Sequence, residues 1–173
     1  GSTRVGFGAG MGGLGVDAGG RREGAGGIIC VDLAEDRLEL ARGQVATETM
    51  IGGEDTVEKI VEETGGFGAD YTFEATGNVA VMRQAVEAAR MAWGQCTVAG
   101  VAGKGETLDI IPRFLITGRR VAGSSFGGVK GRDQVPELID RYLDGEIDVE
   151  PFLSHRISLD EVNRGFELME AQD

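Results

Sequence analysis

The stretch VGFGAGMGGLGVDAGGRREGAGGIICVD, residues 5–32, decides the fold class of this 173-residue chain. Its first apolar run leads into Gly8, Gly10 and Gly13, which have the spacing G-x-G-x-x-G, and its second apolar run ends in Asp32. In a strand–turn–helix unit these glycines permit a tight turn, a close approach of the backbone to a pyrophosphate, and packing of the helix on the strand. The chain holds 30 glycines, so the spacing alone is weak. An acid roughly 20 residues further on binds the hydroxyls of an adenosine ribose, so Asp32 favours a dinucleotide site over a linker, a helix cap or a solvated loop acid.

Beyond this stretch, short apolar runs alternate with segments of helical periodicity. Strands are expected at 4–7, 27–32, 69–75, 95–103 and 119–128, and helices at 34–43, 55–66, 77–94, 133–145 and 158–171. Asp55 with Glu58, and Ser158 with Glu161, are spaced as capping boxes, and Asn78 can cap a third helix. Strands that are apolar along their length and separated by helices form a parallel sheet covered on both faces. The sequence therefore predicts an α/β fold, a Rossmann-type doubly wound parallel sheet, as a single domain over residues 1–173.

The composition excludes several classes of partner. The formal net charge is −12, which argues against nucleic acids and anionic membranes, because both attract clustered Lys and Arg. No apolar run approaches a membrane span, and no signal peptide opens the chain. Cys30 and Cys96 are the only cysteines and lie in expected buried strands, so reduced thiols and a cytoplasmic location are expected. With the single histidine, His155, which is interpreted as structural, they cannot easily build a structural zinc site.

Four segments carry a resemblance: FEATGN at 73–78, VAGVAGKGE at 98–106, ITGRRVAGSSFGG at 116–128 and LDEVNRGFELM at 159–169. Together with the glycine turn they resemble the coenzyme-binding half of the zinc-dependent, medium-chain alcohol dehydrogenases, above all the class III, S-(hydroxymethyl)glutathione (formaldehyde) dehydrogenase branch. The resemblance implies a fragment of a larger enzyme that transfers hydride from an alcohol or from S-(hydroxymethyl)glutathione to NAD. It also implies that zinc is held only in a catalytic domain missing from this chain, so the isolated chain is expected to be inactive.

The resemblance assigns coenzyme-binding roles residue by residue. The pyrophosphate turn, the ribose acid with a basic neighbour, and the ends of three further strands would hold the dinucleotide. They correspond to Gly8, Gly10, Met11, Gly12, Gly13, Asp32, Arg37, Ala75, Thr76, Ala99, Gly100, Val101, Ser124 and Phe126. A carboxylate repels the 2′-phosphate of NADP, so Asp32 predicts NAD as the coenzyme. Two alternatives remain open: core packing for Val101 and Phe126, and an exposed ion pair with Glu35 or Asp36 for Arg37.

The first helix departs from the family pattern. It contains Gly15, Gly19 and Gly20, each of which costs about 1 kcal/mol relative to Ala inside a helix. Asp17 would need burial, which raises its pKa or destabilises the fold. Gly6 stands where a large apolar residue is expected in the first strand, and Met11 replaces a usual glycine. These departures leave open whether residues 4–27 form a competent site, and they support the alternative of a decayed or non-catalytic dinucleotide-binding module. A zinc-free quinone reductase is disfavoured by Asp32, because those relatives usually bind NADPH.

The segment TLDIIPRFLITGRRVAG, 107–123, resembles the part of the family through which two sheets join edge to edge. An exposed apolar edge needs cover, so a homodimer, or a tetramer as in bacterial relatives, is expected. The alternative is that its apolar residues fill the core of their own domain; these are Ile110, Ile111, Phe114, Leu115 and Ile116.

Overall fold

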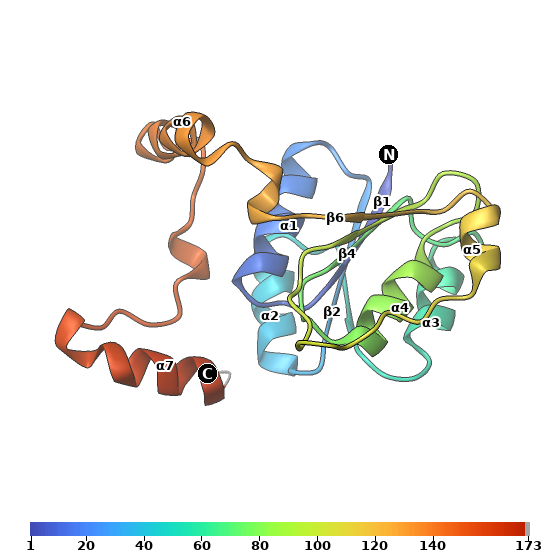
Figure 1. Ribbon diagram of the computed structural model, residues 1–173. Helices are drawn as coiled ribbons and strands as arrows, with labels where there is room; N and C mark the ends of the chain where they lie inside the picture. The colour runs from blue at the N-terminus through green and yellow to red at the C-terminus, as the bar shows by residue number, and fades with distance from the viewer. Residues whose placement is uncertain (172–173) are drawn as a thin grey trace. The chain divides into compact units, whose positions relative to one another are not determined.

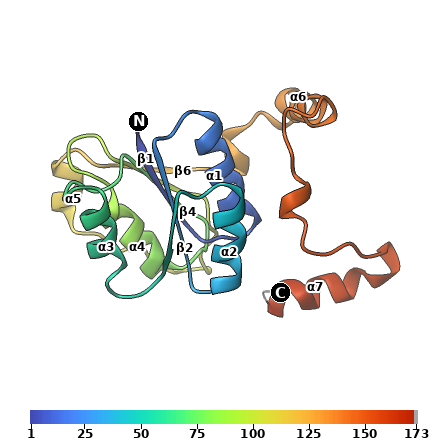
Figure 2. The same ribbon diagram turned by 180° about the vertical axis from the view of Figure 1, so that it is seen from behind.

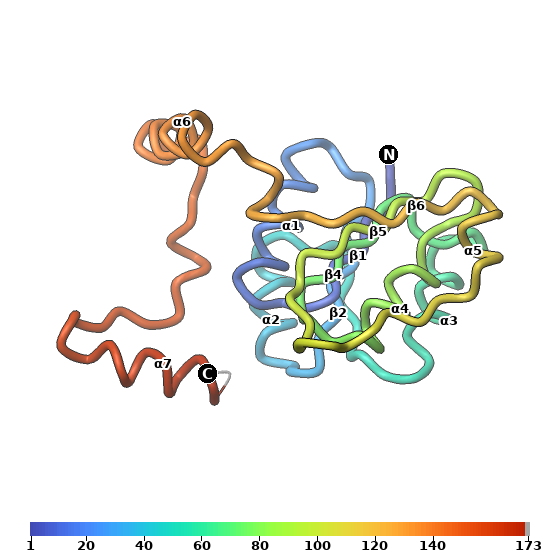
Figure 3. Tube along the Cα trace, viewed as in Figure 1, coloured from blue at the N-terminus to red at the C-terminus, as the bar shows by residue number. Residues whose placement is uncertain are grey.

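The computed structural model describes residues 1–171, and the chain divides into two compact units, Gly1–Val129 and a second unit from Lys130 onward. The first unit contains one six-stranded parallel sheet with the strand order β3-β2-β1-β4-β5-β6. Its strands are β1 (Thr3–Phe7), β2 (Gly27–Asp32), β3 (Glu48–Ile51), β4 (Tyr71–Glu74), β5 (Gln95–Val98) and β6 (Arg120–Gly123). The tube in Figure 3 shows β5 running between β4 and β6.

Helices cover both faces of this sheet, as the views in Figures 1 and 2 show from opposite sides. They are α1 (Met11–Arg22), α2 (Glu35–Gln44), α3 (Thr56–Glu63), α4 (Val79–Ala88) and the short α5 (Pro112–Ile116). Helices α1 and α2 lie on one face, and α3 and α4 lie on the other. The strand order reverses beside β1, where β2 and β3 lie on one side and β4 on the other. This arrangement confirms the predicted doubly wound fold class.

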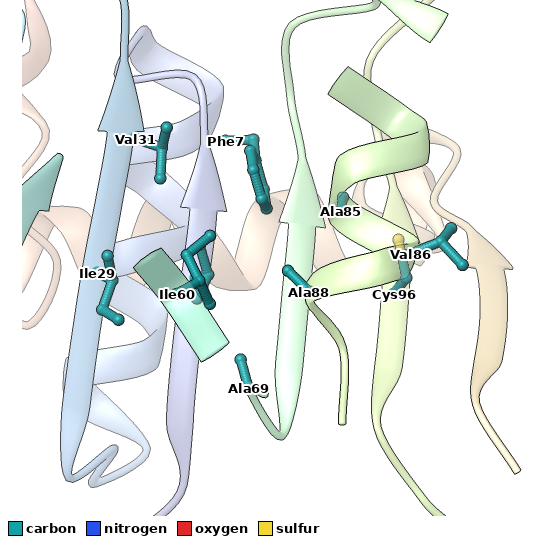
Figure 4. Packing of buried hydrophobic residues seen from close by; sticks show 10 residues of the cluster. Phe7, Ile29, Val31, Ile60, Ala69, Ala85, Val86, Ala88 and Cys96 are labelled. Atoms are coloured by element: carbon teal, nitrogen blue, oxygen red, sulfur yellow. The ribbon is translucent and has the colours of Figure 1, made fainter. Parts of the chain in front are cut away.

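The main apolar core lies between the sheet and the α3–α4 layer (Figure 4). Side chains at alternate positions of β1 and β2 meet those of the two helices, as period-2 strands and period-3.6 helices require. The cluster consists of Val5, Phe7, Ile29, Val31, Ile60, Ala69, Ala85, Val86, Ala88 and Cys96. Both cysteines are buried in their strands, as predicted.

Three local expectations were wrong, and each has a structural reason. Strand β3 was missed because it is a short edge strand whose ends are exposed, so it lacks a buried apolar run. Helix α4 ends at Ala88 rather than at 94, because Ala89 turns extended and pairs with Ala69 in an isolated bridge. Asp55 makes no side-chain cap bond, because its carboxylate pairs with Lys59 one turn further on, with Nζ 2.8 Å from Oδ2.

Other local predictions are confirmed. Asn78 caps α4, since its side-chain oxygen accepts bonds from the amides of Ala80 at 2.9 Å and Val81 at 3.4 Å. The glycine-rich first helix, whose formation the sequence left open, is present as α1 (Met11–Arg22).

The second unit, described by itself, contains α6 (Gly131–Leu143) and α7 (Val162–Ala171), with short 3₁₀ turns at Glu150–Phe152 and Leu159–Glu161. The capping box of Ser158 and Glu161 is present. Within residues 1–171, no helix combines the length and the apolar character needed to cross a membrane.

Candidate functional site

The turn between β1 and α1 forms the center of the candidate site. Gly8 has a φ of +99°, a left-handed conformation that favours glycine. At Gly13 an added Cβ would lie 1.6 Å from the carbonyl oxygen of Gly8, so only glycine lets α1 start this close to the strand. Gly10, by contrast, has open space around its missing side chain, and it is the N-cap of α1 with no side-chain cap bond. The start of α1 therefore presents open backbone amides, a favourable place for an anion.

Asp32 lies at the end of β2, beside this turn. Its Oδ2 atom accepts a hydrogen bond from the Ala9 amide at 2.7 Å, and its Oδ1 atom accepts one from the Ala34 amide at 3.0 Å. Each carboxylate oxygen has a second lone pair, so the half-buried Asp32 can accept ribose hydroxyls while it holds the phosphate turn. Arg37 is half-buried in the first turn of α2, and Met11 is exposed at the start of α1.

The remaining predicted site residues follow β4, β5 and β6 at the same edge of the sheet. Because all six strands are parallel, their carboxyl ends meet there, and ligands of doubly wound sheets bind in the crevice outside those ends. Val101 is 91% exposed and Phe126 is 74% exposed, so the alternative of core packing is wrong for both. The residues that the structure brings to this edge are Ala75, Thr76, Ala99, Gly100, Val101, Ser124 and Phe126.

Sequence reasoning missed Glu74, the last residue of β4. Its side chain is fully buried, and its Oε1 atom accepts hydrogen bonds from the amides of Thr76 and Gly77 at 2.7 and 2.9 Å. The signal was present, because Thr72 and Glu74 alternate with Tyr71 and Phe73 and so share the core-facing side of the strand. A buried acid at a strand end, followed by Thr-Gly, indicates a carboxylate that holds a turn.

The buried acid Asp17 in α1 occupies the space next to Gly6 in β1. Asp17 of α1 is 2% exposed, and a Cβ at Gly6 would lie 2.7 Å from its Oδ1 atom, so the small residue in β1 makes room for the acid. Burial raises the pKa of Asp17 to about 7, although a hydrogen bond with Cys30 acts in the opposite direction. Burial, and then the charge of Asp17, raise the pKa of the Cys30 thiol above its usual range. Two of the departures from the family pattern, Gly6 and Asp17, thus belong to one packed cluster with Cys30.

The residues of the site contain no metal centre. Among residues 1–171 no three His, Cys, Asp or Glu side chains are grouped so that they could hold a metal ion. His155 is exposed in the second unit. What the edge offers is an amide-lined turn, a carboxylate acceptor and exposed apolar residues, which together suit a ligand with phosphate, ribose and aromatic parts.

Comparison with known proteins gives one consistent family. The model of the family described as zinc-binding dehydrogenase matches residues 13–144. S-(hydroxymethyl)glutathione dehydrogenase of Escherichia coli O1:K1 / APEC is 44% identical over 165 residues, which are 94% of this chain and 45% of that protein. The chain thus spans about half the length of the curated relatives it matches.

Solved structures agree with that match. Benzyl alcohol dehydrogenase of Acinetobacter calcoaceticus has a TM-score of 0.89 at 29% identity, over 98% of this chain and 47% of that one. An alcohol dehydrogenase zinc-binding domain protein of Burkholderia ambifaria has a TM-score of 0.89 at 30% identity, over 99% of this chain and 46% of that one. None of these relatives favours the alternative of a module without chemistry.

Proposed function

This chain belongs to the zinc-binding dehydrogenase family, and from that premise we propose that it is the NAD-binding part of an alcohol dehydrogenase. The observation that carries the proposal is the Asp32 carboxylate, which lies at the end of β2 and accepts the Ala9 amide of the phosphate turn. One group thereby joins the place for a pyrophosphate to the place for an adenosine ribose. Gly10 leaves the space that a bound phosphate needs, so the residues present fit the dinucleotide.

Asp32 also decides between the two nicotinamide coenzymes. A carboxylate accepts bonds from both ribose hydroxyls of NAD, and it repels the 2′-phosphate of NADP. We therefore expect NAD to bind more tightly than NADP. Replacing Asp32 with alanine should weaken NAD by at least about tenfold, because hydrogen bonds to a charged group contribute about 1.5–3 kcal/mol each. The same change should narrow the difference in affinity between NAD and NADP, since the Asp32 charge that repels the 2′-phosphate is gone.

Isothermal titration calorimetry of the 173-residue chain with each coenzyme checks this expectation. Asp36→Ala is the matched control, because Asp36 is an exposed acid in the first turn of α2. A folded Asp32→Ala chain that binds NAD as well as the unchanged chain would contradict the proposed role. Equal binding of NAD and NADP by the unchanged chain would contradict the coenzyme choice.

In the whole enzyme, we propose hydride transfer from an alcohol, with S-(hydroxymethyl)glutathione as the substrate class that the curated relatives' name suggests. The nicotinamide, when bound, supplies the hydride acceptor. The residues of this chain bind and orient the coenzyme, and a catalytic zinc would be held by residues outside the chain. The free thiols of Cys30 and Cys96 support a cytoplasmic location.

The isolated chain is expected to show no alcohol oxidation, because it offers a coenzyme site without the metal that activates the alcohol. The assay follows NADH absorbance with added zinc and S-(hydroxymethyl)glutathione or a primary alcohol. A full-length relative from the family serves as the positive control. Zinc-dependent turnover by the 173-residue chain would contradict the expectation.

We further propose that two copies associate through residues 107–123. Strand β6 lies at the edge of the sheet, and the preceding Ile116 is 85% exposed. The alternative, in which the apolar residues of the segment fill the core of their own domain, holds for only part of it. Ile110 and Phe114 pack against the core, whereas Ile111 and Leu115 are exposed. An uncovered edge with apolar neighbours favours pairing with a second copy.

Light scattering at micromolar concentration is expected to give the mass of at least two chains. Ile116→Asp should shift the mass toward one chain, because a charge would be buried in the interface. Leu40→Asp is the control, since Leu40 is an exposed apolar residue of α2, which packs against β2 and β3. A single-chain mass for the unchanged protein would contradict the association.

A further inference from the structure

Glu74 is a buried carboxylate that the proposed function does not use. It ends β4 with 0% exposure, and its neighbours across the sheet are Phe7 of β1 and Val98 of β5. Burying a carboxylate is costly unless hydrogen bonds compensate for the lost water. Because this cost is borne at the carboxyl edge of the sheet, we look for a specific role of Glu74 at that edge.

The contacts of Glu74 hold two turns together. Its Oε1 atom accepts bonds from the Thr76 amide at 2.7 Å, from the Thr76 hydroxyl, and from the Gly77 amide at 2.9 Å. Its main-chain oxygen accepts the amides of Ala99 at 2.8 Å and Gly100 at 2.9 Å. The turns after β4 and after β5 are therefore both fixed to this one residue.

The second side-chain oxygen of Glu74 lies close to the backbone of the same two turns. The Oε2 atom has no hydrogen-bond partner within the described chain, and a Cβ at Gly100 would lie 2.5 Å from it. A Cβ at Gly77 would in turn lie 2.5 Å from the carbonyl oxygen of Val101. The two turns are thus in contact through glycine backbone, and the Glu74 carboxylate sets how closely they approach.

These turns lie on one particular side of the dinucleotide crevice. In the strand order, β2 with Asp32 is on one side of β1, and β4 and β5 are on the other. If Asp32 takes the adenosine ribose and the start of α1 takes the pyrophosphate, the ends of β4 and β5 face the nicotinamide half. This step rests on the proposed function.

We propose that Glu74 is a positioning residue for the nicotinamide half of the coenzyme. It contacts no coenzyme atom itself; it preforms the turns at Thr76–Gly77 and Ala99–Val101 that would receive that half. Preformed turns lower the ordering cost of binding. Loss of the carboxylate should therefore weaken a ligand that reaches these turns and spare a ligand that occupies only the adenosine side.

Titration calorimetry with NAD and with ADP separates the two halves. Glu74→Ala is expected to weaken NAD by about tenfold and to change ADP by less than about twofold. Glu74→Gln should restore NAD affinity, because its amide oxygen can accept the same three bonds. Glu63→Ala is the matched control, since Glu63 is exposed at the end of α3.

Glu74→Asp covers the case in which Glu74→Ala does not fold, as judged by circular dichroism. It keeps the charge but shortens the reach to Thr76 and Gly77, so the selective loss of NAD affinity should remain. Equal losses for NAD and ADP, or no loss for either, would overturn the proposal while leaving NAD binding by the unchanged chain intact. Failure of the unchanged chain to bind NAD would instead overturn the proposed function and, with it, this role.

Discussion

The free energy of unfolding is expected to fall by about 3 kcal/mol between about pH 5 and pH 8, because Asp17 is buried as an acid. Burial raises its pKa from 3.8 to about 7 in the folded chain. Between these two values the unfolded chain releases the proton and the folded chain keeps it. The folded state then binds more protons than the unfolded state, so stability decreases as the pH rises and levels off above about pH 7.

Asp70 and Cys30 also have shifted pKa values, but both act outside this pH window. The pKa of Asp70 is lowered, despite partial burial, by its bonds from the Thr3 amide and from Arg90. Its stabilising effect is therefore lost only as the pH falls below the ordinary range of an aspartate. The pKa of Cys30 is raised by burial, so its effect begins only above the ordinary pKa of a thiol. The change in the free energy of unfolding between pH 5 and 8 consequently reports mainly on Asp17.

Urea unfolding at several pH values, with Asp17→Asn as the comparison, measures this slope. The amide has a similar shape and does not titrate, so the variant's stability should change with pH by less than about 1 kcal/mol over the same range. Gly6→Ala should destabilise the unchanged chain, because its Cβ would lie 2.7 Å from the Asp17 carboxylate. A pH profile identical in the unchanged chain and the Asp17→Asn variant would show that Asp17 is not held as a buried acid.

The second large effect is expected for Gly13→Ala. The added Cβ would lie 1.6 Å from the Gly8 carbonyl oxygen, and backbone atoms cannot yield as a flexible side chain can. Overpacking of this kind costs about 1–3 kcal/mol or more, and the displaced turn should no longer bind NAD. Thermal melting gives the loss of stability, and calorimetry gives the loss of binding.

Gly15→Ala is the control within the same helix. Gly15 is exposed, with open space at its missing side chain, so alanine there should stabilise the chain by about 0.5–1 kcal/mol through helix propensity. NAD binding by this variant should be unchanged. Gly13→Ala that melts and binds like the unchanged chain would mean that α1 does not begin at the close distance seen in the structure.

The phosphate turn and the ribose acid are predicted from the residues themselves, whereas the site residues after β4, β5 and β6 are assigned by the family resemblance. Gly8 and Asp32 have the spacing of a phosphate turn and a ribose acid, and parallel pairing then brings the other strand ends to the same edge. Arg37, at the start of α2, is half-buried. Its two interpretations, a coenzyme contact and an ion pair with Glu35 or Asp36, both stay predictions.

Pairs of residues that compensate for each other across the fold could not be predicted from the sequence in the same way. A glycine in a core strand and an acid in a helix each contradict local rules, and only the register of α1 on β1 shows that Gly6 leaves the space Asp17 fills. Glu74 is a similar case, because the role proposed for it depends on contacts with Gly77 and Gly100, which lie in turns far apart in the sequence. Such residues break local patterns for a reason that lies across the fold.

The most direct test of the central claim is a two-dimensional ¹⁵N–¹H NMR titration of the 173-residue chain with NAD. We expect saturable shifts confined to the carboxyl edge of the sheet, at Gly8–Gly13, near Asp32, and at the turns after β4, β5 and β6. Amides at the opposite edge, such as those of Thr3 and Ala69, should not move. The absence of shifts, or shifts centred on that opposite edge, would contradict the assignment of this edge as a dinucleotide site.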